Sequence, residues 1–223
     1  DPKTRQLLID GIVQRILFDR GGGHPKNIFI SKNTWDTSME GKNLADLCLE
    51  RGLEVTPTNA ALIVFEIIKG GGASAVYHAI NSNDVDQIMQ HPMTSIASDG
   101  PLTVFNEGAP HPRTYGTFAR VLGRYVRERN ILTLEEAIRK MTSLPASVLS
   151  IKKRGLIKEG YFADITVFDS NRIIDKATFE NPHQYAIGVN FVLVNGIIVV
   201  ENGIHNGKRP GRILYGPGYR GNK

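Results

Sequence analysis

The sequence contains a single cysteine, Cys48, among its 223 residues. One cysteine cannot form a disulfide within the chain, so nothing requires an oxidising compartment and we expect a cytoplasmic protein. Cys48 lies at helical spacing with Leu44 and Leu47, which favours a buried thiol over a metal ligand or a nucleophile. No apolar run approaches the roughly 20 residues that cross a bilayer, and no signal-like segment opens the sequence, so we expect no membrane association.

Dense clusters of positive charge are also scarce, although the formal net charge is +5. Cationic and anionic side chains are interleaved along most of the chain, and the only dense run is Lys152-Lys153-Arg154. This run follows a predicted helix end, where cations interact favourably with the helix dipole. We interpret it as a solvated surface and expect no nucleic-acid partner.

Phosphate-binding loops are absent as well. The two runs of three glycines, 21–23 and 70–72, have neither the spaced glycines nor the lysine of such a loop. Each run follows an apolar helical pattern, so both are interpreted as helix terminators.

The chain does contain a clear alternation of predicted strands and helices over its first two thirds, followed by a mostly β pattern after about residue 155. Gly203 begins a tail that we expect to lie on the surface. The predicted helices comprise a first one through Leu8, Ile12 and Ile16 and others at 42–51, 56–69, 83–91, 114–129, 134–142 and 143–149. The predicted strands are 27–31, 73–80, 93–98, 161–168, 188–194 and 197–200.

Asp99 is the strongest candidate for chemistry. It ends the predicted strand 93–98 and precedes Gly100, and functional residues in α/β folds gather at the C-terminal ends of strands. A carboxylate there can hold a metal and accept a proton from a metal-bound water. The competing interpretation is an Asx turn, in which Asp99 bonds its own backbone before Gly100.

The residues around Asp99 favour the first interpretation. The segment 111–123 reads HPRTYGTFARVLG and follows SDG at 98–100. It closely resembles the N-acyl-D-amino-acid deacylase (D-aminoacylase) family of the amidohydrolase superfamily, in which SDG is followed by HPR-x-[YW]-GTF-x-RVLG. Residues 154–169, with the Asn195-Gly196 turn after them, resemble β segments shared across the superfamily. The segments at 40–44 and 73–91 also fit, so the resemblance covers most of the chain.

The resemblance implies an α/β fold: residues 1–150 as the C-terminal part of a (β/α)8 barrel, and 151–223 as strands of a small composite β-sandwich with a C-terminal strap. It implies hydrolysis of an N-acyl-D-amino acid to a carboxylate and a free D-amino acid. Asp99 would be both the catalytic residue and a metal ligand, activating a zinc-bound water and then protonating the leaving amine. Asp164, in the β segment, would be a structural hydrogen-bond acceptor.

One departure from the family is large. The superfamily's first metal motif is H-x-H, and none of the six histidines forms it. Enzymes of the family are also roughly twice as long as this chain. We therefore expect a C-terminal fragment, inactive alone, that binds no zinc by itself and needs its missing N-terminal barrel half. An exposed barrel half would also favour homo-oligomers.

Three further residues are weaker candidates for substrate binding. Arg113 suits bidentate recognition of a substrate carboxylate, although a structural arginine at a helix start fits equally well. His111, in the same loop, is either a pocket residue or a solvent-facing histidine. Ile80, at the end of the predicted strand 73–80, would shape the acyl or side-chain pocket. His78, on the same strand face, is interpreted as a core or edge residue.

Two other functions remain open at the level of the sequence. A cyclic-amide hydrolase of the hydantoinase or dihydroorotase type would keep the superfamily and change the substrate, although the HPRTYGTF segment argues against it. A non-catalytic folding or association module is favoured, for this chain taken alone, by the missing metal ligands.

Overall fold

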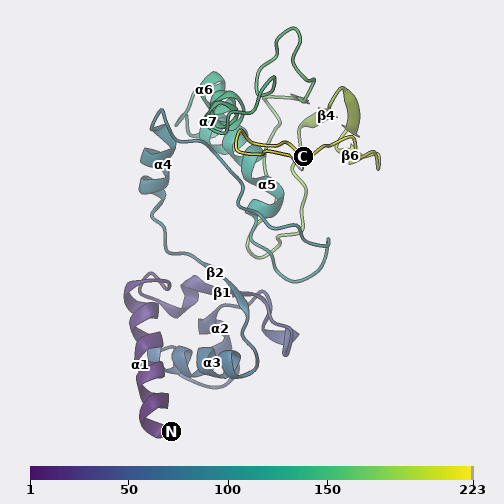
Figure 1. Cartoon of the computed structure of the whole chain (residues 1–223). Coiled ribbons are helices and arrows are strands. Elements are labelled where there is room, and N and C mark those ends of the chain that lie inside the picture. Colours follow the sequence, from purple (N-terminus) through teal and green to yellow (C-terminus); the bar gives the residue numbers. More distant parts are fainter. Residues whose placement is uncertain (222–223) are drawn as a thin grey trace. The chain divides into compact units, whose positions relative to one another are not determined.

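The computed structural model describes residues 1–221, which fall into two compact units. Unit 1 consists of Asp1–Asp84, Pro101–Pro112 and Thr178–His183. Unit 2 consists of Val85–Gly100, Arg113–Ala177 and Gln184–Lys223. Each unit is described by itself (Figure 1). The predicted division at residue 150 stays a prediction.

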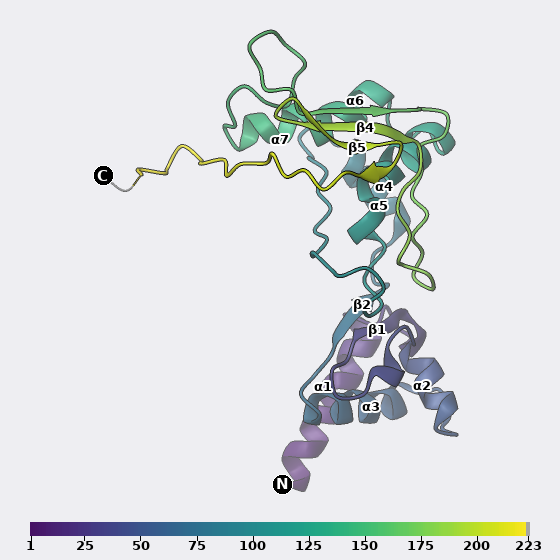
Figure 2. The same ribbon diagram turned by 90° about the vertical axis from the view of Figure 1, so that its right-hand side faces the viewer.

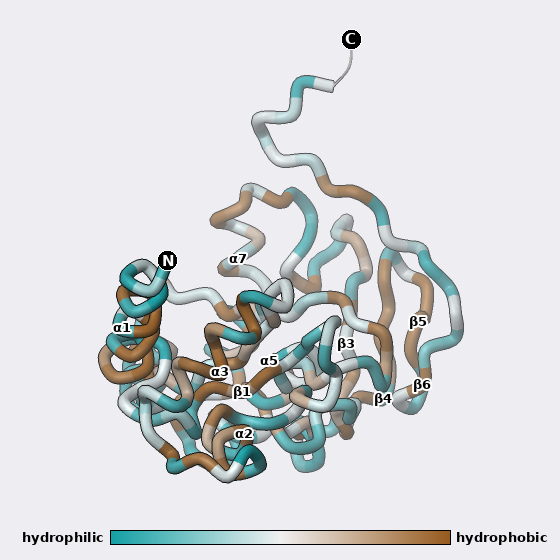
Figure 3. Tube along the Cα trace, turned by 90° about the horizontal axis from the view of Figure 1, so that it is seen from below, coloured by the Kyte–Doolittle hydropathy of each residue, from teal (hydrophilic) through white to brown (hydrophobic). Residues whose placement is uncertain are grey.

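Unit 1 packs three helices and a two-stranded antiparallel sheet around one apolar core. The helices are α1 (Pro2–Phe18), α2 (Leu44–Glu50) and α3 (Pro57–Lys69). Strand β1 (Ile28–Lys32) pairs antiparallel with β2 (Ser74–Tyr77). Helix α1 carries both apolar and hydrophilic residues along its length (Figure 3), and Ile9 and Ile16 are buried in the core. The buried core comprises Ile9, Ile16, Ile28, Ile30, Leu44, Leu47, Cys48, Ala60, Ala61, Ile63 and Ile67, with Met39 from the short 3₁₀ turn Thr37–Met39.

Helix starts in this unit follow from local side-chain chemistry. Asn43 and Asp46 form a reciprocal capping box at the start of α2, and the Thr56 hydroxyl accepts from Asn59 N–H at the start of α3. These bonds satisfy backbone donors that have no partner within the helix. Cys48 is fully buried, as expected, and burial raises the pKa of its thiol.

Unit 2 contains a four-stranded antiparallel sheet in the order β3-β4-β5-β6 (Figure 2). Its strands are β3 (Ile165–Phe168), β4 (Val189–Val194), β5 (Ile197–Glu201) and β6 (Ile204–His205). Residues 206–221 form no helix or strand. Asn195 and Gly196 join β4 to β5 with φ angles of 49° and 81°, the left-handed pair that a tight hairpin turn requires.

The helices of unit 2 precede this sheet in sequence. They are α5 (Arg113–Arg120), α6 (Leu134–Met141) and α7 (Ser143–Val148), while α4 (Ser82–Gln90) begins in unit 1 and ends in unit 2. The predicted helix 114–129 is confirmed as helical, but its second half is a π-helix, η3 (Val121–Glu128). The buried core consists of Ala119, Val121, Leu122, Leu132, Ala137 and Ile173.

The predicted strand 93–98 is wrong. Ile96 N–H donates to the Lys140 carbonyl at 3.0 Å, at the end of α6, and the segment is in no strand ladder. Ile96 packs against the core of unit 2. An apolar run predicts burial but not whether a neighbouring strand pairs with it.

The α/β class is supported, but the two described sheets are both antiparallel. The parallel barrel expected for residues 1–150 therefore stays a prediction. In the described part of the chain, no helix combines the length and the apolar character that a bilayer span requires.

Candidate functional site

Asp99 lies in an exposed turn beside Arg113. Its φ angle is +48°, and 84% of its side chain is exposed. The Ser98 hydroxyl accepts from Gly100 N–H at 3.3 Å, while the Asp99 Oδ2 atom lies 2.9 Å from Arg113 Nη2. An ion pair this exposed contributes no more than about 1 kcal/mol.

Gly100 brings this turn against the start of α5. A Cβ atom on Gly100 would lie 2.9 Å from Thr114 Cα, so only glycine permits this approach. The Thr114 hydroxyl oxygen is buried and finds no hydrogen-bond partner among the described residues. A buried polar atom without a partner costs about 1–3 kcal/mol. The first turn of α5 therefore holds a polar group that a ligand or another part of the protein would stabilise.

Helix α5, which lies within the HPRTYGTFARVLG segment, is held by an ion pair at its last residue. Arg120 Nη1 donates to Asp175 Oδ2 at 2.8 Å, and the Asp175 side chain is only 8% exposed. Burial opposes the charge on Arg120, but the hydrogen bond and the charge of Asp175 outweigh it and raise the pKa of Arg120.

Two glycines, Gly116 in α5 and Gly123 in η3, let the chain around Asp175 approach these helices. A Cβ on Gly116 would lie 2.5 Å from Asp175 Cβ, and one on Gly123 would lie 2.4 Å from the Ile173 carbonyl. Gly116, Arg120 and Gly123, all within the segment that carries the resemblance, therefore lie against residues 173–175. Sequence reasoning missed Asp175, because its partner is 55 residues away.

The other two predicted substrate-binding residues belong to unit 1. His111 lies in loop 101–112, and its ring centroid is 5.0 Å from that of Phe179 in edge-to-face contact. Ile80 lies beyond the end of β2 and is 77% exposed. His78 packs at 4.1 Å from the Phe179 ring, which agrees with its interpretation as a structural residue. The structure thus brings Asp99 and Arg113 together in unit 2. His111 and Ile80 belong to unit 1.

Asp164 is confirmed as a structural acceptor. It accepts from Asn195 N–H at 2.8 Å and pairs with Arg154. Burial raises the pKa of Asp164, but these partners outweigh it and lower the pKa overall. Lys152 and Lys153 are exposed, as expected for a solvated run, whereas only 10% of the Arg154 side chain is exposed. The solvated interpretation of Arg154 was therefore wrong, because its guanidinium joins the hydrogen bonds around Asn195.

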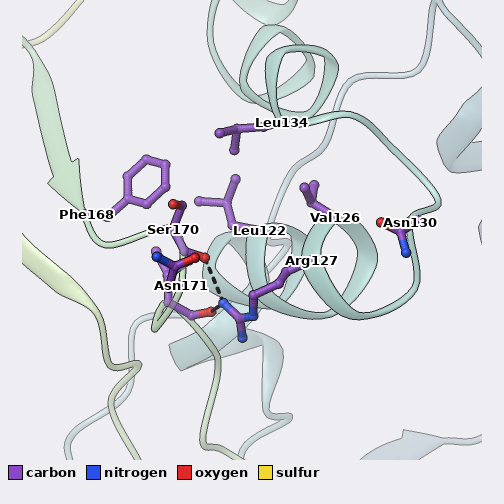
Figure 4. A pocket seen from close by; sticks show the side chains of 9 residues that line it. Leu122, Val126, Arg127, Asn130, Leu134, Phe168, Ser170 and Asn171 are labelled. Atoms are coloured by element: carbon purple, nitrogen blue, oxygen red, sulfur yellow. Dashed lines mark hydrogen bonds between the residues drawn. The ribbon is translucent and has the colours of Figure 1, made fainter.

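A cavity of about 240 Å³ lies elsewhere in unit 2 (Figure 4). Its one cationic group, Arg127, already donates to the carbonyls of Ser170 and Ile173, so it is not available to a ligand. The cavity contains none of the candidate site residues. It is lined by Leu122, Val126, Arg127, Asn130, Leu134, Phe168, Ser170, Asn171 and Ile173.

Within residues 1–221, no three His, Cys, Asp or Glu side chains are grouped closely enough to hold a metal ion. Asp99 supplies one exposed carboxylate, and its neighbour is the cation Arg113. A catalytic zinc site takes three protein ligands. The described residues therefore do not form a metal site by themselves.

The sequence as a whole assigns the chain to a class of hydrolases. Residues 66–200, more than half of the chain, match the profile of the amidohydrolase family. The chain belongs to that family.

Within this family, the chain is similar to enzymes named as deacylases of N-acyl-D-amino acids. It is 40% identical to N-acyl-D-glutamate deacylase of Alcaligenes xylosoxydans xylosoxydans over 81% of this chain and 35% of that protein. It is 38% identical to D-aminoacylase of the same organism over 79% of this chain and 34% of that protein. The crystal structure of N-acyl-D-glutamate deacylase from Bordetella bronchiseptica, complexed with zinc and a phosphonate inhibitor, matches with a TM-score of 0.74. That match has 37% identity and covers 91% of this chain and 39% of that one.

These similarities confirm the resemblance seen in the sequence. The chain spans about a third of the length of the curated relatives it matches.

Proposed function

We propose that this chain is the C-terminal part of an enzyme that hydrolyses N-acyl-D-amino acids to a carboxylate and a free D-amino acid. The single observation that carries the proposal is the exposed Asp99 carboxylate beside Arg113, in the segment shared with D-amino acid deacylases. The similarity to such deacylases over about four fifths of the chain supports it.

Each residue has a distinct role in this proposal. Asp99 accepts a proton from the water that attacks the acyl carbon, and then gives it to the leaving nitrogen as the amide bond breaks. Arg113 releases Asp99 and binds the substrate carboxylate, because a guanidinium suits bidentate recognition of that group. The Thr114 hydroxyl, buried without a partner among the described residues, offers a further donor at the same helix start. His111 and Ile80, in unit 1, stay predicted substrate-binding residues.

The rest of the enzyme would supply what the described residues do not hold. We propose that the complete enzyme needs zinc, that Asp99 is one of its ligands, and that the others lie outside this chain. The zinc in the Bordetella bronchiseptica deacylase structure supports this. Residues 1–150 would form the C-terminal part of a (β/α)8 barrel, whose N-terminal half lies outside this chain. Residues 151–223 would contribute strands to a β-sandwich. The chain alone would be inactive, with self-association through the uncovered barrel edge, and the single buried cysteine supports a cytoplasmic location.

Of the alternatives, the cyclic-amide hydrolase is not favoured, because the similarity over most of the chain is to deacylases of D-amino acids. A non-catalytic association module is not favoured either, because the curated relatives that the chain matches over most of its length are deacylases.

The test measures hydrolysis of several substrate classes by the complete enzyme and by the 223-residue chain. The complete enzyme, loaded with zinc, is assayed against N-acyl-D-amino acids, their L-enantiomers and hydantoins, and the 223-residue chain is assayed in parallel. We expect turnover of the D-compounds by the complete enzyme only. Preferential turnover of hydantoins would replace the proposal by the cyclic-amide function. Stoichiometric zinc binding and turnover by the 223-residue chain would contradict its being an inactive part.

A further inference from the structure

Loop 101–112 joins the two candidate site residues in sequence, because it begins two residues after Asp99 and ends immediately before Arg113. It contains no helix or strand, so it has no regular ladder of backbone hydrogen bonds. Asn106 and Gly108 adopt positive φ angles of 67° and 63°. A loop without a regular ladder of hydrogen bonds keeps one conformation when contacts from other parts of the protein hold it.

His183 holds the loop with both of its ring nitrogens. Asn106 N–H donates to His183 Nδ1 at 3.1 Å, and Nε2 lies 2.9 Å from the Gly108 carbonyl oxygen. Asn106 N–H donates to Nδ1, so the tautomer that satisfies both contacts carries its hydrogen on Nε2 and donates to the Gly108 carbonyl. Both partners belong to the main chain, so the bonds fix the loop backbone itself. The Phe105 ring adds an edge-to-face contact at 5.5 Å.

Phe179 contacts the same loop near its end. Its ring lies 5.0 Å from that of His111 and 4.1 Å from that of His78, which follows β2. Phe179 therefore joins His111 to the end of the β1–β2 sheet of unit 1.

The segment that carries Phe179 and His183 is itself braced. Thr178 N–H donates to the Asn181 carbonyl at 3.1 Å, and Asn181 N–H donates to the Thr178 hydroxyl at 3.0 Å. On the other side of the loop, Ala109 N–H donates to the Ser31 carbonyl of β1 at 2.8 Å. Loop 101–112 is thus held between β1 and residues 178–183.

We propose that residues 178–183 form a clamp that sets the conformation of loop 101–112, with His183 as its principal positioning residue. The clamp fixes the backbone at Asn106 and Gly108 through His183 and the ring of His111 through Phe179. Its consequence for catalysis rests on the proposed function, since this loop carries His111 and leads directly into Arg113. The geometry assigns His183 no contact with the reacting atoms.

Hydrogen exchange tests the clamp without any assay of activity. Exchange of the backbone amides of residues 101–112 is measured by NMR or mass spectrometry in the 223-residue chain and its variants. His183→Phe keeps an aromatic ring and removes both hydrogen bonds, so we expect exchange at Asn106 to accelerate about tenfold, given about 0.5–1.5 kcal/mol for each bond. His183→Gln keeps one acceptor and one donor, and should recover most of the protection.

Two further variants separate the clamp from a general loss of structure. His205→Phe is the matched control, because the His205 ring accepts only a local bond from Gly207 N–H, and it should leave the loop unchanged. Phe179→Leu should accelerate exchange near His111 more than at Asn106. Equal exchange at Asn106 in His183→Phe and His205→Phe would overturn the proposal. So would uniform acceleration throughout unit 1, including α3.

Kinetics of the complete enzyme test the catalytic consequence. We expect His183→Phe to lower kcat by about tenfold or more with a smaller change in KM, and His183→Gln to restore much of it, because misplacement of a loop acts on the transition state. A lower melting temperature with unchanged kcat and KM would reduce His183 to a structural role. If the enzyme does not hydrolyse N-acyl-D-amino acids at all, the proposed function fails, while the exchange data still decide whether the clamp exists.

Discussion

Helix α5 carries two Arg–Asp pairs of nearly equal length, and they differ in their exposure to water. Arg113, its first residue, lies 2.9 Å from Asp99, whose side chain is 84% exposed. Arg120, its last residue, lies 2.8 Å from Asp175, whose side chain is 8% exposed. Water screens the first pair and competes for both partners, whereas the second is largely sheltered. The same two side-chain types therefore serve a breakable contact at one end of the helix and a structural one at the other.

The largest expected effect is on activity, and it should distinguish Asp99 from Asp175. Asp99→Ala in the complete enzyme should lower kcat by about 10²–10⁴-fold, the usual contribution of a general acid or base. In the 223-residue chain, which is proposed to bind no zinc, the free energy of unfolding should change by less than about 1 kcal/mol, because the side chain is exposed. Steady-state kinetics of the complete enzyme and urea unfolding of the 223-residue chain measure the two effects. Activity near wild type would remove Asp99 from the mechanism.

The next effect separates them by stability. Asp175→Ala should lower the free energy of unfolding by about 2 kcal/mol, since it leaves Arg120 without its buried partner. The value stays at the low end because 40% of the Arg120 side chain remains in water. Asp99→Ala is the matched control in the same urea titration. If the two variants are equally stable, burial does not distinguish the pairs.

A third variant tests whether the exposed pair is exchanged for substrate. Arg113→Ala should raise KM roughly tenfold for substrates that carry a free carboxylate, and less for the corresponding neutral amides, because the lost charge-assisted bond is worth about 1.5–3 kcal/mol. Arg113→Lys, which keeps the charge but not the fork, should fall between. Equal increases for acid and amide substrates would make Arg113 a structural residue.

The helix starts were predictable from sequence, and the ion-pair partners were not. Thr133 accepts from Glu136 N–H at 3.2 Å, as the spacing of these residues predicts, because the donor and acceptor lie within one turn. Asp175 and His183 act on partners 55 to 77 residues away, and no local pattern encodes such distances. For the same reason the apolar run 93–98 predicted a strand, although Ile96 bonds to the end of α6 instead.

The candidate site could likewise be predicted in part from the sequence. Asp99 and Arg113 were found through a shared segment, and the structure places them 2.9 Å apart. That segment did not reveal which of its residues serve packing. Gly116 and Gly123 match the family's motif, but the reason why glycine is needed there is seen only in the close approach of residues 173–175. Close approach of backbones is a property of tertiary structure.

A third ion pair, between the partly exposed side chains of Glu136 and Arg139, refines the comparison through pH. Glu136 bonds Arg139 at 2.7 and 2.8 Å and lies 3.5 Å from the buried Lys140 ammonium. The hydrogen bond from Arg139 is the main cause that lowers the pKa of Glu136 from 4.5 to about 2. Because the folded state holds the lower pKa, its stabilising contribution is complete above pH 4.5 and is lost as the pH falls toward 2.

The variant Glu136→Gln should therefore be less stable than wild type at neutral pH, with the difference shrinking between pH 4.5 and pH 2. Urea midpoints measured across this range would show it, and added salt should reduce it, since the carboxylate is partly exposed. Glu135→Gln, in the same turn and exposed to water, is the matched control. A Glu136→Gln difference that stays constant down to pH 2 would mean that packing, and not charge, holds this turn of α6.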